Sequence, residues 1–406
     1  MGKADTGKGK ETGFGMRRTC SVCGRGSMDV FFQVEESPVF CNVLWSRREE
    51  AIAAPRAPIY LGFCNRCGLV YNVAFDAKVM EYSSAYENSL HFSPFFREYA
   101  QNLADQLISK YDLHDKDVIE IGCGRGDFLA LLCERGGNRG VGFDPSYAAE
   151  NNIGDSVGSR VVILPKSYLT AGADYEADFI CCRHVLEHID EPLEFLIGVR
   201  DVMSRRSGGV VYFEVPNALC TFERMGVWDI IYEHCSYFTD DSARNLFEIA
   251  GFDCAEVSER YGGQFIGIEA RVAKGRNQRA LVSLSRDTAG LVRDFARSYK
   301  QIVQKWRQRL GEFAQRREKV VIWGAGSKGV MFLNTLDISC EQVPYAVDVN
   351  PRKHNRFIPG TAQQVVAPGF VKDYQPQTIV VMNPVYVPEI QQMLKQHGVE
   401  TELIVA

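Results

Sequence analysis

The chain has 406 residues, of which 46% are apolar and 24% charged, and its net charge is −5 at pH 7. This length predicts roughly two or three globular domains. The acidic balance argues against nucleic acid as the main partner, and no apolar run reaches the ~18 residues of a membrane span. Residues 1–15 are rich in Gly and Lys and lack the apolar core of a secretory signal, so we expect a disordered tail.

Residues 16–84 are expected to form a zinc-binding domain around two Cys-x-x-Cys pairs, Cys20/Cys23 and Cys64/Cys67. Each pair is followed by glycine, and two such turns complete a tetrahedral four-sulfur site without an open position, so the zinc would be structural. The alternatives are two unrelated pairs or a redox disulfide, but a redox pair usually opens a helix in a βαβ unit. The other nine of the thirteen cysteines are scattered, which is typical of a reducing compartment and predicts a cytoplasmic protein.

Residues 85–274 alternate helical and strand-like patterns, which predicts an α/β domain with a doubly wound, mostly parallel sheet. The expected elements are helices over 95–111 and 127–135 and strands over 117–121, 139–143, 160–164, 178–182 and 209–215. Two further runs, 253–260 and 264–272, meet at Gly262 and Gly263. They predict a terminal antiparallel hairpin.

A glycine-rich turn follows the strand over 117–121, with glycines at Gly122, Gly124 and Gly126. Glu120 precedes the turn, and Asp144 ends the next strand about twenty residues on, where an acid can bind the ribose hydroxyls of an adenosine cofactor. A dinucleotide would bring a diphosphate to the turn, which the nearby acid disfavours. S-adenosylmethionine has no phosphate and carries a sulfonium and an ammonium, which suit Glu120 better.

On these residues the sequence resembles the class I methyltransferase family, over about residues 85–274. The family's first motif matches residues 120–126, its acidic ribose residue matches Asp144, and a further motif matches residues 183–188. The resemblance implies that Glu120, the three glycines and Asp144 bind S-adenosylmethionine.

Two histidines, His184 and His188, lie four residues apart next to Glu187, as in some metal sites, but the sequence offers no evident third ligand. We expect His184 to face the cofactor or substrate at the carboxyl end of a strand, where open α/β sheets bind ligands. A packed polar residue is the alternative. Asn217 follows another strand and is a candidate substrate contact.

Titratable side chains cluster in Tyr232, Glu233 and His234, with Tyr237 close by. Imidazole titrates near neutral pH, so His234 could take a proton from a carbon next to a carbonyl, and Glu233 could orient the ring. A hydrogen-bonded structural turn is the alternative.

Residues 275–318 predict a helical connector with one apolar face and one basic, solvated face. Residues 319–406 open with Gly-x-Gly-x-x-Gly from Gly324 to Gly329, and Asp348 follows the next strand. This pattern predicts a Rossmann-like domain, although the remaining chain makes only half of a dinucleotide fold. Substrate nucleotide binding, a purely structural half and a bound dinucleotide stay open.

The order of these blocks resembles the tridomain sugar C-methyltransferases, which act on nucleotide-linked 4-keto-deoxysugars. The resemblance implies that His234 removes the C3 proton, that the enolate attacks the methyl group, and that the C-terminal half flanks the substrate. The remaining residues singled out are Tyr232 and His188 as catalytic groups, Tyr82 or Tyr86 as the tyrosine over the site, and Tyr86, Tyr237, Lys328 and Tyr386 as substrate contacts. Lys328 could hold a nucleotide diphosphate. Residues 87–91 depart from the pattern of these enzymes.

The sequence therefore predicts an S-adenosylmethionine-dependent C-methyltransferase with a structural zinc, acting on a nucleotide sugar or a similar small metabolite. Nucleic acid and membrane are not expected as partners. Transfer of the methyl group to oxygen or nitrogen is one alternative, and a zinc-bearing scaffold protein with a vestigial cofactor site is another.

Overall fold

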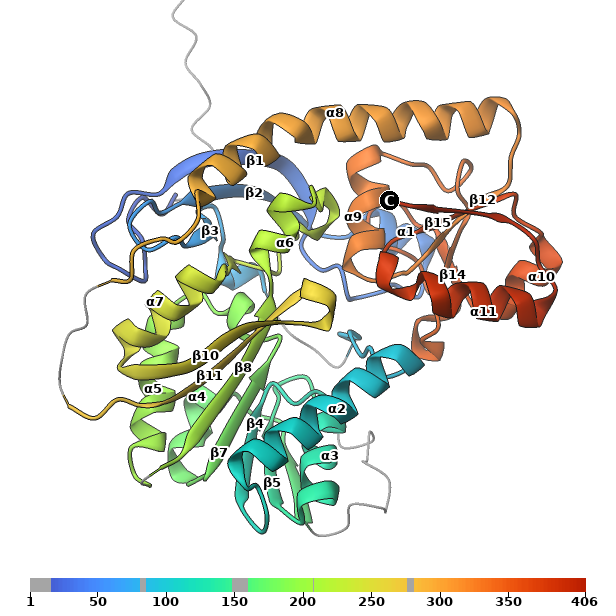
Figure 1. The fold of residues 1–406 in the computed structure, drawn as a ribbon. Coiled ribbons are helices and arrows are strands. Elements are labelled where there is room, and N and C mark those ends of the chain that lie inside the picture. The colour runs from blue at the N-terminus through green and yellow to red at the C-terminus, as the bar shows by residue number, and fades with distance from the viewer. Residues whose placement is uncertain (1–15, 81–84, 148–159, 207, 276–280) are drawn as a thin grey trace, which may run out of the picture.

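The computed structural model describes residues 16–80, 85–147, 160–206, 208–275 and 281–406. The expected N-terminal tail and Tyr82 lie outside these residues. Three β-sheets make up the framework, and a long helix, α8, runs along one edge of the molecule (Figure 1). Among the described residues, no helix has both the length and the apolar character needed to cross a membrane.

The N-terminal sheet is antiparallel, with the strand order β1-β2-β3-β9. Its strands are β1 (Asp29–Pro38), β2 (Arg56–Phe63), β3 (Val70–Asn72) and β9 (Ser236–Tyr237). The short helix α1 (Arg48–Ile52) comes between β1 and β2 in the chain. The last strand comes from far along the chain: Val70 pairs with Tyr237, and the Asn72 N–H donates to Cys235 O at 2.8 Å. The segment that contains His234 is therefore attached to the N-terminal sheet.

The central sheet has seven strands in the order β10-β11-β8-β7-β4-β5-β6. They are β4 (Asp117–Ile121), β5 (Arg139–Phe143), β6 (Val161–Leu164), β7 (Phe179–Arg183), β8 (Val210–Pro216), β10 (Phe252–Arg260) and β11 (Phe265–Val272). All pairs are parallel except those of β11 with β8 and β10. The predicted hairpin is confirmed. The architecture is a mixed α/β fold with a mostly parallel central sheet.

Helices cover both faces of the central sheet because its strands are apolar on both sides. One face packs against α2 (Pro94–Tyr111) and α3 (Asp127–Gly136). The other packs against α4 (Tyr168–Ala171), α5 (Pro192–Met203) and α7 (Asp240–Ala250). Helix α2 begins at Pro94, where the Ser93 hydroxyl caps the Phe96 N–H, and α7 begins with a capping box between Thr239 and Ser242.

The C-terminal sheet is parallel, with the order β14-β13-β12-β15-β16. Its elements are β12 (Val320–Trp323), α9 (Ser327–Leu336), β13 (Tyr345–Val347), β14 (Gln364–Val366), α10 (Val371–Tyr374), β15 (Thr378–Val381), α11 (Val387–His397) and β16 (Glu402–Val405). Short 3-10 turns lie at Ala77–Val79, Gly172–Asp174, Leu186–His188, Val227–Asp229, Tyr261–Gly263, Pro351–Lys353, Pro368–Phe370 and Pro384–Tyr386.

The helix α8 (Thr288–Gln315) joins the N-terminal and C-terminal sheets with the apolar face expected from its sequence. The Phe295 ring lies 5.6 Å from Phe32 in β1 and 5.2 Å from Phe222 in α6 (Ala218–Glu223), while Trp306 lies 5.1 Å from Phe332 in α9. These elements share one hydrophobic core that includes residues from the N-terminal sheet, the 218–237 segment and the C-terminal sheet. That core fixes the 218–237 segment from several sides.

Candidate active site

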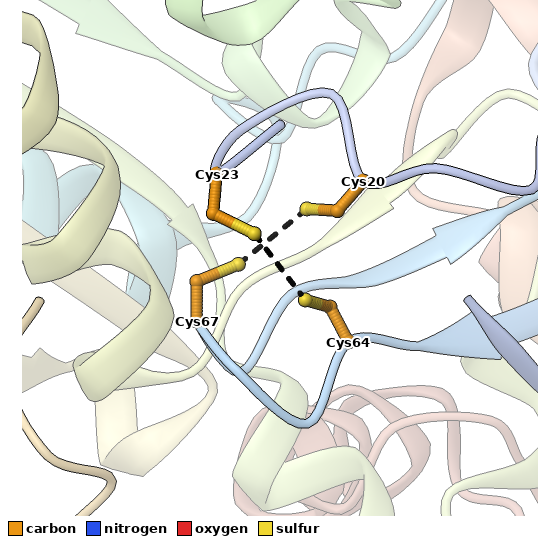
Figure 2. Close-up of side chains that lie close together, drawn as sticks. All are labelled: Cys20, Cys23, Cys64 and Cys67. Carbon is orange, nitrogen blue, oxygen red and sulfur yellow. Dashed lines mark hydrogen bonds between the residues drawn. The ribbon is translucent and has the colours of Figure 1, made fainter. Parts of the chain in front are cut away.

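The four paired cysteines converge on one point (Figure 2). The Cys20 and Cys67 sulfurs lie 3.5 Å apart, and those of Cys23 and Cys64 lie 3.7 Å apart. A tetrahedral site with Zn–S bonds of about 2.3 Å needs sulfur separations of about 3.8 Å, so the donor set fits zinc. Gly26 closes the turn beside it, since a Cβ there would lie 2.3 Å from the Cys64 sulfur.

The three glycines of the first turn all adopt left-handed backbone conformations, with φ of 68°, 54° and 81° at Gly122, Gly124 and Gly126. Their surroundings differ. A Cβ on Gly122 would lie 2.1 Å from the Val185 side chain, whereas a Cβ on Gly124 would meet nothing within 4 Å. The Gly122 side of the turn is packed, and the Gly124 side faces open space.

Two carboxylates frame this turn. Glu120 is 4% exposed, and its Oε2 accepts the Leu129 N–H of α3 at 2.9 Å. Burial raises the pKa of Glu120 to about 8, against the opposing effect of Arg183. Asp144 accepts the Gly124 N–H at 2.7 Å and both the N–H and the hydroxyl of Ser146, at 2.8 and 2.6 Å. Since a carboxylate has about four acceptor positions, ribose hydroxyls would use the remaining one and compete with Ser146 for another.

A buried ionic network lies at the carboxyl ends of β7 and β8. Arg183 donates twice to Glu214 Oε1, at 3.1 and 2.9 Å, and its guanidinium lies 4.2 Å from the centre of the Phe128 ring. His184, at φ 56°, places Nε2 3.1 Å from the same Glu214 oxygen and Nδ1 3.8 Å from Glu187. Burial lowers the pKa of His184, but the contacts with Glu187 and Glu214 outweigh it and raise that pKa to about 9. Both ring nitrogens of His184 thus face carboxylates of the protein itself.

The imidazoles of His188 and His234 lie edge to face, with ring centres 4.9 Å apart. The nearby carboxylate is that of Glu187: one of its oxygens and one nitrogen of each ring all lie within 4.8 Å of one another. Burial lowers the pKa of both histidines, that of His234 to about 3 with a further contribution from His188.

Glu233 does not orient the His234 ring, contrary to the expectation from sequence. Its fully buried side chain faces Cys41, Asn42 and Tyr86, and burial raises its pKa to about 7. Glu187 was visible in the sequence beside His188, but only the fold brings it to His234. Residues 232–233 lie in a turn, from which the neighbouring side chains of Glu233 and His234 leave toward different contacts.

Three other predicted site residues make structural hydrogen bonds. The Tyr232 hydroxyl accepts the Asp76 N–H at 3.0 Å, and the Tyr237 hydroxyl accepts the Ile231 N–H at 3.0 Å. Asn217 caps α6 through Leu219 and donates to Gly263 O at 2.9 Å. Tyr232, Tyr237 and Asn217 are 0%, 5% and 3% exposed, so they brace the segment that carries His234.

Two of the predicted substrate contacts, Lys328 and Tyr386, lie in the C-terminal half and have different surroundings. Lys328, in the first turn of α9, forms an ion pair with Asp229 and lies near enough to His234 to lower its pKa. The Tyr386 hydroxyl accepts a hydrogen bond from Tyr261 at 2.9 Å and joins the C-terminal sheet to the hairpin of the central sheet. Tyr86, on the N-terminal side, accepts a hydrogen bond from Asn42 at 3.2 Å.

The second glycine-rich turn, at Gly324–Gly329, is closed by two side chains from the segment that follows β13. Asp348 accepts the Ala325 N–H at 2.9 Å, and the Lys353 ammonium lies 3.5 Å from the same carboxylate. Lys353 is 6% exposed and also donates to Ala325 O at 3.4 Å. The acid that would bind a dinucleotide ribose is therefore already neutralised by a buried lysine.

Comparison with known families supplies the class of the central fold. Residues 93–257 match the family model of a methyltransferase domain. This segment of the chain is therefore similar to a methyltransferase domain. Residues 269–406 match a second model, the C-methyltransferase C-terminal domain. No curated protein matches the sequence.

Solved structures of methyltransferases resemble part of the chain. One is N,N-8-amino-8-demethyl-D-riboflavin dimethyltransferase from Streptomyces davawensis, with 23% identity, a TM-score of 0.36 and coverage of 44% of this chain and 56% of that one. Another is 1,6-didemethyltoxoflavin-N1-methyltransferase from Burkholderia thailandensis with bound S-adenosylhomocysteine, at 16% identity, a TM-score of 0.36 and coverage of 44% and 81%. The chain thus spans little more than half the length of the first of these enzymes.

Proposed function

We propose that this protein is an S-adenosylmethionine-dependent C-methyltransferase that acts on a nucleotide-linked keto-deoxysugar or a similar small metabolite. The observation that carries the proposal is the placement of His234, whose buried imidazole lies edge to face with that of His188, with ring centres 4.9 Å apart, and close to the carboxylate of Glu187. A neutral imidazole is a proton acceptor, and methylation at carbon needs one. The C-methyltransferase C-terminal domain at residues 269–406 supports transfer to carbon over transfer to oxygen or nitrogen.

The residues of the first glycine-rich turn suit this cofactor. Glu120 is a buried carboxyl with one hydrogen-bond donor, and a cationic ligand beside it would favour its charged form. Gly124 leaves open space on the side where a ligand would lie, and Asp144 would hold ribose hydroxyls. S-adenosylmethionine, when bound, supplies a methyl group on a sulfonium.

In the proposed reaction, His234 takes the proton from a substrate carbon next to a carbonyl, and the electron pair of that C–H bond passes into an enolate. The same carbon would then be the nucleophile for the methyl group that bound S-adenosylmethionine supplies, with S-adenosylhomocysteine as the leaving group, and the imidazolium would later release its proton to water. Lys328 would meet the negative charge of the substrate's nucleotide, with Asp229 as its partner in the free protein.

We also propose that Cys20, Cys23, Cys64 and Cys67 hold one structural zinc ion. Four thiolates leave no open coordination position, so the ion would stabilise the N-terminal sheet and take no part in the reaction.

The test is solvent deuterium exchange into a panel of nucleotide-linked 4-keto-deoxysugars, with and without S-adenosylmethionine. We expect exchange next to the carbonyl, methylation of the same carbon when the donor is present, and loss of both in His234→Asn. His114→Asn, at an exposed surface position, is the matched control. Exchange at the normal rate in His234→Asn would remove His234 from the role of base. Methyl transfer only to oxygen or nitrogen would select that alternative, and absence of S-adenosylhomocysteine binding in calorimetry would favour the scaffold alternative.

A further inference from the structure

Glu187 lies close to three histidines, His184, His188 and His234. It lies in the 3-10 turn Leu186–His188 directly after β7, and its side chain is turned inward so that the residue is 1% exposed. One carboxylate oxygen is 3.8 Å from His184 Nδ1. The other, Oε2, has no hydrogen-bond partner among the residues that the structure describes. Burying a carboxylate oxygen without a hydrogen-bond donor costs folding free energy, which indicates that this carboxylate has a role other than stabilising the fold.

Hydrogen bonding fixes how His188 carries its proton. Its Nδ1 lies 2.8 Å from the carbonyl oxygen of Glu233. A carbonyl only accepts, so Nδ1 bears the hydrogen, and in the neutral ring the lone pair is on Nε2. The Cys235 thiol donates to the backbone oxygen of Glu187 at 3.4 Å, which ties the turn to the segment that carries His234.

The charges around His234 are mostly of one sign. The titratable groups that act on it are His188, Glu187, His184 and Lys328. Lys328 is a cation, and the pKa of about 9 makes His184 a second cation at neutral pH. When His234 accepts a proton it becomes a third positive charge in a buried place. His184 also faces Glu214, and Lys328 is paired with Asp229, so each of these cations has a carboxylate of its own. Among the groups that act on His234 itself, Glu187 is the one anion.

We propose that Glu187 is the positioning residue of this site, whose carboxylate, together with that of Glu214, holds His184 as a cation and stabilises the His188–His234 pair when that pair accepts the substrate proton. The proposal rests on the proposed function for the identity of the proton donor. The proton moves from the substrate carbon to a ring nitrogen of His234, and Glu187 itself gains and loses nothing. Because Glu187 acts through the histidines, removing its charge should change the pKa values of the histidines and the rate of proton transfer together.

The size of the effect follows from Coulomb's law. At the 3.8 Å between Glu187 and His184 Nδ1, a unit charge in an effective dielectric between 20 and 80 shifts the pKa of its neighbour by roughly one to three units. Glu187→Gln should therefore lower the pKa of His184 by about that amount. A weaker base at His234 should slow deuterium exchange roughly threefold to tenfold near pH 7.

The experiment is an NMR titration of the full-length protein labelled with ¹³C at histidine, for wild type, Glu187→Gln, Glu187→Asp and the matched control Glu194→Gln. Glu194 is exposed on α5, so this control should leave the titrations unchanged. We expect the His184 signal to titrate near pH 9 in wild type and at least one unit lower in Glu187→Gln. Glu187→Asp keeps the charge and should lie between the two. Deuterium exchange is measured on the same samples.

Unchanged histidine titrations in folded Glu187→Gln would overturn the proposal. So would a second metal ion per chain, beyond the zinc expected at the cysteines, that Glu187→Gln releases, because Glu187, His188 and His234 would then be its ligands. If no keto-sugar exchanges even with wild type, the proposed function fails, while the titration still decides the role of Glu187.

Discussion

Alanine substitutions at Gly122 and Gly124 separate the packing of the first turn from its contact with a ligand. Both glycines have left-handed φ, at 68° and 54°, so alanine costs about 1–2 kcal/mol of conformational strain at either position. At Gly122 the new Cβ would also lie 2.1 Å from the Val185 side chain, far inside van der Waals contact. Relieving such overpacking costs about 1–3 kcal/mol more, which gives a total of about 2–5 kcal/mol for Gly122→Ala.

Thermal unfolding followed by circular dichroism, and calorimetry with S-adenosylhomocysteine, measure the two effects. At roughly 2–4 °C per kcal/mol for a domain of 150–250 residues, Gly122→Ala should unfold several degrees below Gly124→Ala. Gly124→Ala should lose only the stability that the strain accounts for, about 1–2 kcal/mol. It should also bind the ligand at least about tenfold more weakly, because its methyl group enters the open side of the turn. Equal losses of stability would refute the role of the Val185 contact. Undiminished affinity in Gly124→Ala would refute the placement of the ligand.

Three further substitutions test separate parts of the molecule. Cys64→Ser combined with Cys67→Ser should lose one zinc ion per chain in elemental analysis and lower the unfolding temperature; metal retained at the wild-type ratio would contradict a four-sulfur site. Burial raises the pKa of Glu120 from 4.5 to about 8, so between these pH values the folded state keeps a proton that the unfolded state releases. Glu120 therefore contributes its full stabilisation below pH 4.5, and this contribution is lost as the pH rises through 8. Glu120→Gln should remove that decline in unfolding temperature between pH 4.5 and 8, and an identical pH profile would argue against it. Lys328→Met should raise KM for the nucleotide sugar about tenfold with unchanged affinity for S-adenosylhomocysteine, and an unaltered KM in initial-rate kinetics would exclude a phosphate contact.

Sequence reasoning succeeded where the chemistry is local. The Cys-x-x-Cys turns place two sulfurs on one side of a short loop, and the four sulfurs do converge. The β10–β11 hairpin was visible because Gly262 and Gly263 interrupt two strand-like runs, and both have positive φ. The helices and parallel strands of the central sheet followed from hydrophobic periodicity, which burial against a core imposes directly.

It failed where a side chain's direction depends on tertiary contacts. Glu233 precedes His234 in the chain but faces Cys41 and Asn42, and Glu187, 47 residues upstream, takes its place. The second glycine-rich turn also looked open in sequence, because nothing local indicates that Lys353 neutralises Asp348. In both cases the decisive partner comes from another element.

In the proposed reaction, the attachment of the segment that carries His234 would give the N-terminal sheet a part in catalysis, even though the proposed metal would do no chemistry. His234 lies between Tyr232, whose hydroxyl bonds to Asp76, and the strand β9, which pairs with β3. The Cys64 and Cys67 turn lies between β2 and β3, so it sets the start of the strand on which β9 depends. Loss of order at the cysteines would therefore free the base from one side while leaving the cofactor turn intact. Such a loss should slow proton transfer more than it weakens binding of S-adenosylhomocysteine.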